Sequence, residues 1–156
     1  MGNDKNYYID KEELYNTVKK YKETGCKISY ERIGKYILDI STAIASNYKY
    51  NRYPFLEEMI GDAIVDCIKG IDKIDLDNKS KNIYSYFTVT VWRAFWRRIA
   101  NEKTNLYVKF KYQLDNQHMD NLTSSNEEIV VGNVGDFHKM IEFVNEYEHN
   151  KNKKKK

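Results

Sequence analysis

The residues best suited to bind a ligand lie between positions 85 and 97, where aromatic and arginine side chains recur at helical spacing. At about 100° per residue, one face of this segment collects Ser85, Tyr86, Val89, Thr90, Arg93, Trp96 and Arg97. Arginine neutralises phosphate groups, and aromatic rings stack on unpaired bases with about 1–3 kcal/mol per base. The face therefore predicts binding to single-stranded nucleic acid. The alternative is structural, with Trp96 packed against another helix and the arginines in surface ion pairs.

An acidic segment precedes this face. Residues 56–77 contain seven acids and two bases, whereas residues 93–111 contain six bases and one acid. Glu58, Asp62 and Asp66 are spaced by four and share one face of a helix, where each pair of like charges costs about 0.2–0.5 kcal/mol. A sequence that keeps this repulsion indicates a basic partner. The alternative is a solvated face whose acids favour the start of the helix.

Helical periodicity dominates the elements that must position these faces. Asp10 and Glu13 form an N-capping pattern for a first helix, which we expect to end at about Glu23, before Gly25. Ser29 is expected to cap a second helix. The buried face of this second helix is expected to carry Ile33, Ile37, Ile40 and Ile44.

Two further helices are expected to carry the acidic and aromatic segments. The third is predicted from about Phe55 to Ile74 and the fourth from about Asn82 to Lys103. The buried stripe of the third is expected to be Ile60, Ile64, Cys67, Ile71 and Ile74. The core side of the fourth is expected to be Ile83, Phe87, Val91, Ala94 and Phe95. The predicted fold is therefore all-α, a compact bundle of about four helices.

The chain is predicted to divide into five stretches. An N-terminal helix occupies residues 1–26, and the main helical domain occupies residues 27–112. Residues 113–133 are expected to form a polar, partly disordered linker. Residues 134–148 are expected to form a short amphipathic helix, and residues 149–156 a disordered lysine-rich tail.

Composition limits the classes of protein to which the chain can belong. Its 156 residues fit one domain with flexible ends, and its single proline, Pro54, leaves long helices uninterrupted. The net charge of +3 depends on five lysines among the last six residues, without which the remainder carries −2. A uniformly basic DNA-coating protein is thereby excluded. Cys26 and Cys67 lack partners at metal-ligand spacing, so we expect both to be reduced, packed thiols.

The remaining motif classes give negative expectations. The sequence has no apolar run long enough for a membrane span or a signal peptide, so we expect a cytoplasmic location and no membrane partner. The three histidines are scattered, and no P-loop, nucleophile elbow or Rossmann loop occurs. We therefore expect no enzyme activity, no catalytic residue, no metal site and no cofactor.

The acidic and aromatic segments together resemble region 2 of the sigma-70 family, most closely the late-transcription sigma factors of large tailed bacteriophages. The similar residues, 57–103, read EEMIGDAIVDCIKGIDKIDLDNKSKNIYSYFTVTVWRAFWRRIANEK. An acidic helix ends in IKGIDKID, a charged turn contains KSKN, the YSYFT segment follows, and an aromatic helix ends on RRIANEK. Weaker similarity extends over residues 27–112, just over half of the chain.

The resemblance implies two binding surfaces and no covalent chemistry. The acidic helix would dock on the clamp helices of the largest subunit of core RNA polymerase, through Glu57, Glu58, Asp62, Asp66 and Lys69. The next helix would capture the single-stranded non-template strand of an A·T-rich −10-type promoter element as the duplex melts. This second role would fall on Tyr86, Val89, Thr90, Arg93, Trp96 and Arg97.

The sequence departs from the family pattern in three places. Val89 and Thr90 stand where primary sigma factors carry adjacent tryptophans, and Trp96 is a candidate to compensate. No helix-turn-helix follows, so −35 recognition is expected to be absent. The chain ends in lysines in place of the segment that binds a sliding clamp, for which residues 137–147 are a candidate substitute. A sliding clamp or a coactivator thus remains a possible partner.

The main alternative is a helical adaptor or anti-sigma-like protein that binds RNA polymerase or another partner without contacting DNA. Exposure of the face formed by Arg93, Trp96 and Arg97 would favour DNA capture, whereas a buried Trp96 would favour the adaptor. A further alternative is RNA binding by residues 131–135, which resemble the GXXG loop of KH domains. Asp136 follows that loop and the strands of the KH fold are missing from the pattern, which argues against it.

Overall fold

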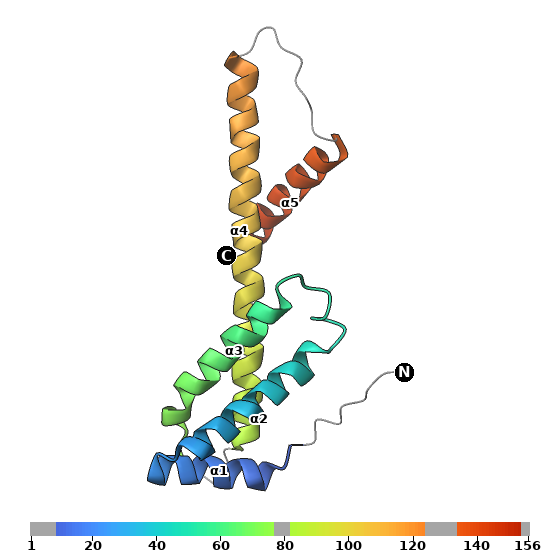
Figure 1. The fold of residues 1–156 in the computed structure, drawn as a ribbon. Helices are drawn as coiled ribbons and strands as arrows, with labels where there is room; N and C mark the ends of the chain where they lie inside the picture. Colours follow the sequence, from blue (N-terminus) through green and yellow to red (C-terminus); the bar gives the residue numbers. More distant parts are fainter. Residues whose placement is uncertain (1–8, 77–81, 124–133, 154–156) are drawn as a thin grey trace. The chain divides into compact units, whose positions relative to one another are not determined.

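The computed structural model describes residues 9–76, 82–123 and 134–153, and every regular element within these ranges is a helix (Figure 1). The predicted all-α class is confirmed. The chain divides into two units, Met1–Arg98 and Ile99–Lys156. The division falls inside one helix, α4 (Ile83–Thr123).

Helix α1 (Lys11–Thr24) begins and ends as the sequence predicts. The Asp10 side chain accepts hydrogen bonds from the backbone N–H groups of Glu12 at 2.8 Å and Glu13 at 3.3 Å. Gly25 closes the helix in the left-handed conformation, with φ 63°, and donates its N–H to the Tyr21 carbonyl at 2.8 Å. Both ends are therefore determined by local capping chemistry.

Helix α2 (Lys27–Ala45) begins three residues earlier than the predicted cap requires. Cys26 occupies the N-cap position, and Ser29 is buried within the first turn. After the left-handed Gly25 only Cys26 is extended, and the chain is helical from Lys27, so Ser29 lies inside the helix and cannot cap it. Ile33, Ile37 and Ile40 are buried as predicted, whereas Ile44 is half-exposed, one residue before the helix ends.

Helix α3 (Leu56–Gly70) differs from the prediction in the residues that its first turns bury. Its buried residues are Met59, Ala63, Cys67 and Gly70, while Ile60 and Ile64 are half-exposed. Small side chains at three of these positions permit close approach of α4, where the Cys67 Sγ lies 3.9 Å from the Phe87 carbonyl oxygen. Cys67, Ile71 and Ile74 are buried as predicted, so the prediction was wrong only at Ile60 and Ile64. The last predicted turn is a separate 3-10 helix, η1 (Ile71–Lys73).

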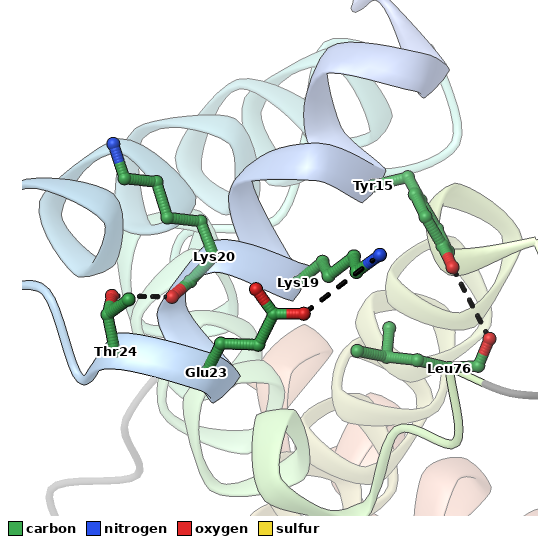
Figure 2. Close-up of polar contacts among 6 residues, drawn as sticks. All are labelled: Tyr15, Lys19, Lys20, Glu23, Thr24 and Leu76. Atoms are coloured by element: carbon green, nitrogen blue, oxygen red, sulfur yellow. Dashed lines mark hydrogen bonds and ion pairs between the residues drawn. The ribbon is translucent and has the colours of Figure 1, made fainter.

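The connection from η1 toward α4 is held by α1. The Lys22 Nζ donates to the carbonyl oxygens of Asp72, at 3.1 Å, and Ile74. The Tyr15 hydroxyl donates to the Leu76 carbonyl at 3.4 Å, as Figure 2 shows beside the Lys19–Glu23 ion pair of the same helix. Helix α1 thus holds the backbone of the connection that leads to the aromatic segment. Residues 77–81 of the predicted charged turn lie outside the described residues.

Helix α4 has the predicted core but is much longer than predicted. Its inward side chains in the first unit are those expected: Ile83, Phe87, Val91, Ala94 and Phe95. The helix continues past Lys103 to Thr123, through eleven residues predicted as linker. Residues 104–123 are polar but contain no glycine or proline, so nothing ends the helix there. Residues 124–133 lie outside the described residues.

The second unit pairs the later part of α4 with α5 (Val134–Lys153) through aromatic side chains. Tyr107 stacks on Tyr147 with ring centroids 4.5 Å apart, and Phe110 meets Phe143 edge-on at 5.6 Å. The candidate clamp-binding segment is therefore a packed helix. The helix also includes residues 149–153, which were predicted as disordered tail, whereas residues 154–156 lie outside the described part of the chain.

Candidate nucleic-acid and protein-binding faces

The outward face of α4 in the first unit carries large exposed side chains. Trp96 is 60% exposed and Val89 is 48% exposed, and Arg93 lies between them on the same face. These three predicted DNA-binding residues therefore remain accessible. A buried Trp96, which would have favoured the adaptor hypothesis, is not observed.

Two other predicted DNA-binding residues use their hydroxyl groups in hydrogen bonds within the fold. Tyr86 is half-buried, and its hydroxyl donates to the Gly70 carbonyl at 3.3 Å. Thr90 is also half-buried and donates its hydroxyl to the Tyr86 carbonyl at 2.9 Å, within the helix. Tyr86 therefore packs over the end of α3, and neither side chain is presented as openly as Trp96.

Arg97 lies at the edge of this face and is paired with α3. Its Nη1 donates to the Asp66 Oδ2 at 2.6 Å, and this hydrogen bond raises the pKa of the guanidinium group further. Half of the arginine side chain is exposed, but the Asp66 side chain is 26% exposed. The structural alternative, a surface ion pair, is thus realised for Arg97. One residue predicted to bind DNA neutralises one predicted to bind polymerase.

A second ion pair repeats this arrangement one helical turn away. The Arg98 Nε lies 3.2 Å from the Asp62 Oδ2, and both side chains are about one-third exposed or less. The acids at two of the three positions spaced by four are therefore matched by arginines of α4. Like-charge repulsion along α3 is relieved inside the fold, so it requires no external partner at these positions.

The remaining polymerase-binding candidates stay on the surface. Glu57 and Glu58 are exposed in the first turn of α3, and neither forms an ion pair with another of the described residues. Lys69 is exposed in the last turn of the same helix. The accessible acidic surface is consequently the N-terminal end of α3, smaller than the sequence suggests.

A second tryptophan that the prediction did not include belongs to the same face of α4. Trp92 is 40% exposed, and it stands one turn before Trp96. Its ring packs edge-on against Tyr50, with centroids 6.0 Å apart. The i, i+4 spacing of the two tryptophans was visible in the sequence and could have indicated that they share a face.

Tyr50 comes from the turn between α2 and α3 and is the least expected member of the core. It is 3% exposed, and its ring also meets Phe95 edge-on at 5.3 Å. Its buried hydroxyl has no hydrogen-bond partner among the described residues, and burial raises its pKa. An unsatisfied buried hydroxyl lowers the free energy of unfolding by about 1–3 kcal/mol, so phenylalanine would be more stabilising at this position if packing were its only role.

Other classes of site are not supported by the described residues. No group of three or more His, Cys, Asp or Glu side chains among them is arranged to hold a metal ion. Burial raises the pKa of the Cys67 thiol to about 12, which makes it a poor nucleophile. None of the helices in the described ranges is long and apolar enough to cross a membrane.

Comparison with known proteins adds no family assignment. No protein-family model matches the chain, and no curated protein is significantly similar to it in sequence.

Proposed function

We propose that this chain is a sigma factor of the phage late type, which binds core RNA polymerase through α3 and the unpaired strand of a melted promoter through α4. The observation that carries the proposal is the exposed indole of Trp96 beside Arg93, on a helix with no acid between Ile83 and Asn101. Aromatic stacking together with phosphate neutralisation is the chemistry that unpaired DNA requires. The resemblance of residues 57–103 to sigma region 2 supports the same assignment.

Transcription is the direct test. Host core enzyme is supplied with supercoiled and pre-melted templates bearing A·T-rich −10-type elements, with and without the protein. The expected result is a promoter-dependent product that appears with the protein, and that needs less protein on the pre-melted template. A protein that yields no such product on either template is not a sigma factor.

The polymerase contact is tested at the accessible end of α3. Reversing Glu57 and Glu58 to lysine is expected to abolish co-purification with core enzyme, because neither carboxylate is used within the described fold. Glu31→Lys, an exposed position of α2, is the matched control and is expected to leave binding unchanged. Asp62 and Asp66 are unsuitable for this test, since their reversal would break ion pairs with α4.

The alternative function is an adaptor or anti-sigma-like protein that binds polymerase without DNA. The pairing of Arg97 and Arg98 with α3 carboxylates favours it, because it reduces the positive charge offered to phosphate. The two functions differ in one measurement. An adaptor would co-purify with core enzyme but would neither bind a single strand nor support transcription from a melted template.

A further inference from the structure

We infer that the turn between α2 and α3 completes the single-strand binding surface of α4, with Trp92 and Trp96 as two stacking rings and with Lys49 and Arg52 as additional phosphate contacts. The inference deepens the proposed function and rests on it in taking an unpaired DNA strand as the ligand. It assigns a role to the turn at residues 46–53.

The turn contacts helix α4 through one aromatic side chain, Tyr50. Tyr50 packs edge-on against both Trp92 and Phe95, and Phe95 is fully buried. Tyr50 thus connects the exposed ring of Trp92 to the core and limits its movement. We assign Tyr50 as a positioning residue for Trp92.

The turn itself is ordered by hydrogen bonds. The N–H groups of Tyr50 and Asn51 donate to the Asn47 carbonyl at 2.9 and 3.1 Å, and the Asn47 side chain accepts from the Lys49 N–H at 3.1 Å. Tyr53 donates its N–H to the Tyr50 carbonyl at 3.0 Å. The flanking residues Lys49 and Arg52 are therefore held on the surface beside a buried anchor.

Charge complementarity selects a polyanion as the ligand. Residues 40–56 carry two bases and no acid, and residues 83–101 carry three bases and no acid. Contact through Tyr50 brings these two acid-free segments together. Lys49 and Arg52, on either side of Tyr50 in the turn, and Arg93, next to Trp92 in the helix, are all exposed.

The spacing of the rings suits an extended strand. Trp92 and Trp96 are four residues apart, hence about 6 Å along the helix axis, so that two successive nucleotides can each meet one ring. Stacking on indoles is tolerant of sequence, because every base presents a π-face. In the family pattern the tryptophans are adjacent and stand at the positions of Val89 and Thr90; here the stacking rings lie farther along the same helix.

Tryptophan fluorescence gives a direct assay, because the chain contains two tryptophans and both lie in this surface. The protein is titrated at low salt with single-stranded oligodeoxythymidine, and with duplex DNA for comparison. We expect quenching by the single strand at lower concentrations than by the duplex. Trp92→Ala and Trp96→Ala are each expected to weaken binding by about 5- to 150-fold, the range of one base–aromatic stack.

The basic turn is tested by salt dependence. Lys49→Gln and Arg52→Gln are each expected to lower the slope of log affinity against log salt by about 0.7, the value for one phosphate contact to a single strand. Lys35→Gln, an exposed position of α2, is the matched control and is expected to leave the slope unchanged. Equal slopes for all three variants would exclude the turn from the surface.

The role of Tyr50 is separated from general stability by two variants. Tyr50→Phe keeps the ring and is expected to bind like the wild type, whereas Tyr50→Leu is expected to weaken binding about as much as Trp92→Ala and to shift the emission of Trp92. Absence of single-strand quenching in the wild type, or unchanged affinity in Trp92→Ala, would overturn the inference. If these variants still support transcription, the sigma function stands but the proposed role of the turn and the tryptophans does not. If the wild type binds the single strand but supports no transcription, the binding surface stands but the sigma function does not.

Discussion

Gly70 and Tyr86 form a contact whose perturbation separates a structural role for Tyr86 from a DNA-binding one. A Cβ atom on Gly70 would overlap the Tyr86 hydroxyl and would lie 3.3 Å from two carbons of its ring. The backbone at Gly70, with φ −85° and ψ −14°, is open to any residue. The cost of Gly70→Ala therefore arises from the Tyr86 side chain and not from backbone strain.

The change in the free energy of unfolding is the sum of two destabilising contributions and one stabilising contribution. Overpacking at a buried position costs about 1–3 kcal/mol, and loss of the hydrogen bond from Tyr86 to the Gly70 carbonyl adds about 0.5–1.5 kcal/mol. Alanine recovers about 0.5–1 kcal/mol of helical preference over glycine. We expect Gly70→Ala to lower the free energy of unfolding by roughly 1–3 kcal/mol in total.

A double-mutant cycle with Tyr86→Phe isolates the contact. Removing the hydroxyl leaves the ring carbons at 3.3 Å as the nearest atoms, a tight but tolerable distance. Gly70→Ala should thus be nearly neutral in the Tyr86→Phe background, which gives a coupling energy of about 1–3 kcal/mol between the two sites. Urea denaturation followed by circular dichroism measures all four proteins.

Additive effects would refute the reasoning, because they would mean that Tyr86 does not rest on Gly70. If the coupling is found, the affinity of Tyr86→Phe for single-stranded DNA shows whether the Tyr86 hydroxyl also contributes to DNA binding. Unchanged affinity would identify Tyr86 as a packing residue of the α3–α4 junction. A loss comparable to that of Trp96→Ala would restore it to the binding face.

Three further changes test separate features of the fold. Asp66→Asn frees Arg97 from its ion pair, so the affinity for single-stranded DNA should rise a few-fold. The free energy of unfolding should fall by no more than about 1 kcal/mol, because the pair is partly exposed. A fall in affinity would contradict the phosphate role of Arg97. Gly61→Ala meets no atom within 4 Å on the exposed side of α3 and should raise stability by about 0.5–1 kcal/mol in thermal melts, unlike Gly70→Ala. Alkylation of the native protein near neutral pH should label Cys26, whose pKa is lowered by backbone N–H groups at the start of α2, before Cys67, whose raised pKa keeps it a thiol. Since the folded-state pKa of Cys67 is raised from an ordinary 9.0, its favourable contribution to stability is present below pH 9 and declines as the pH rises toward 12.

The parts of the fold that local chemistry determines were predictable. The caps of α1 at Asp10 and Gly25, and the core side of α4, follow from residue type and spacing within one helix. The face of α3 depends on what packs against it, and in its first turns Met59 and Ala63 are buried in place of Ile60 and Ile64. Burial of Tyr50 was hidden for the same reason, since its partners lie more than forty residues away in the sequence.

The acidic and basic segments show why a charge pattern is an incomplete guide to a binding site. Each segment was assigned to its own external partner, yet Asp62 and Asp66 meet Arg98 and Arg97 across the α3–α4 interface. Complementary charges on neighbouring helices pair with each other before they pair with a partner, because the fold already holds them close. Their pairing does not carry the loss of translational and rotational freedom that binding a partner requires. The charges left for partners are those without an internal match. On α3 these are at its N-terminal end, and on α4 they accompany the exposed tryptophans, so the two proposed surfaces are narrower than the sequence indicates.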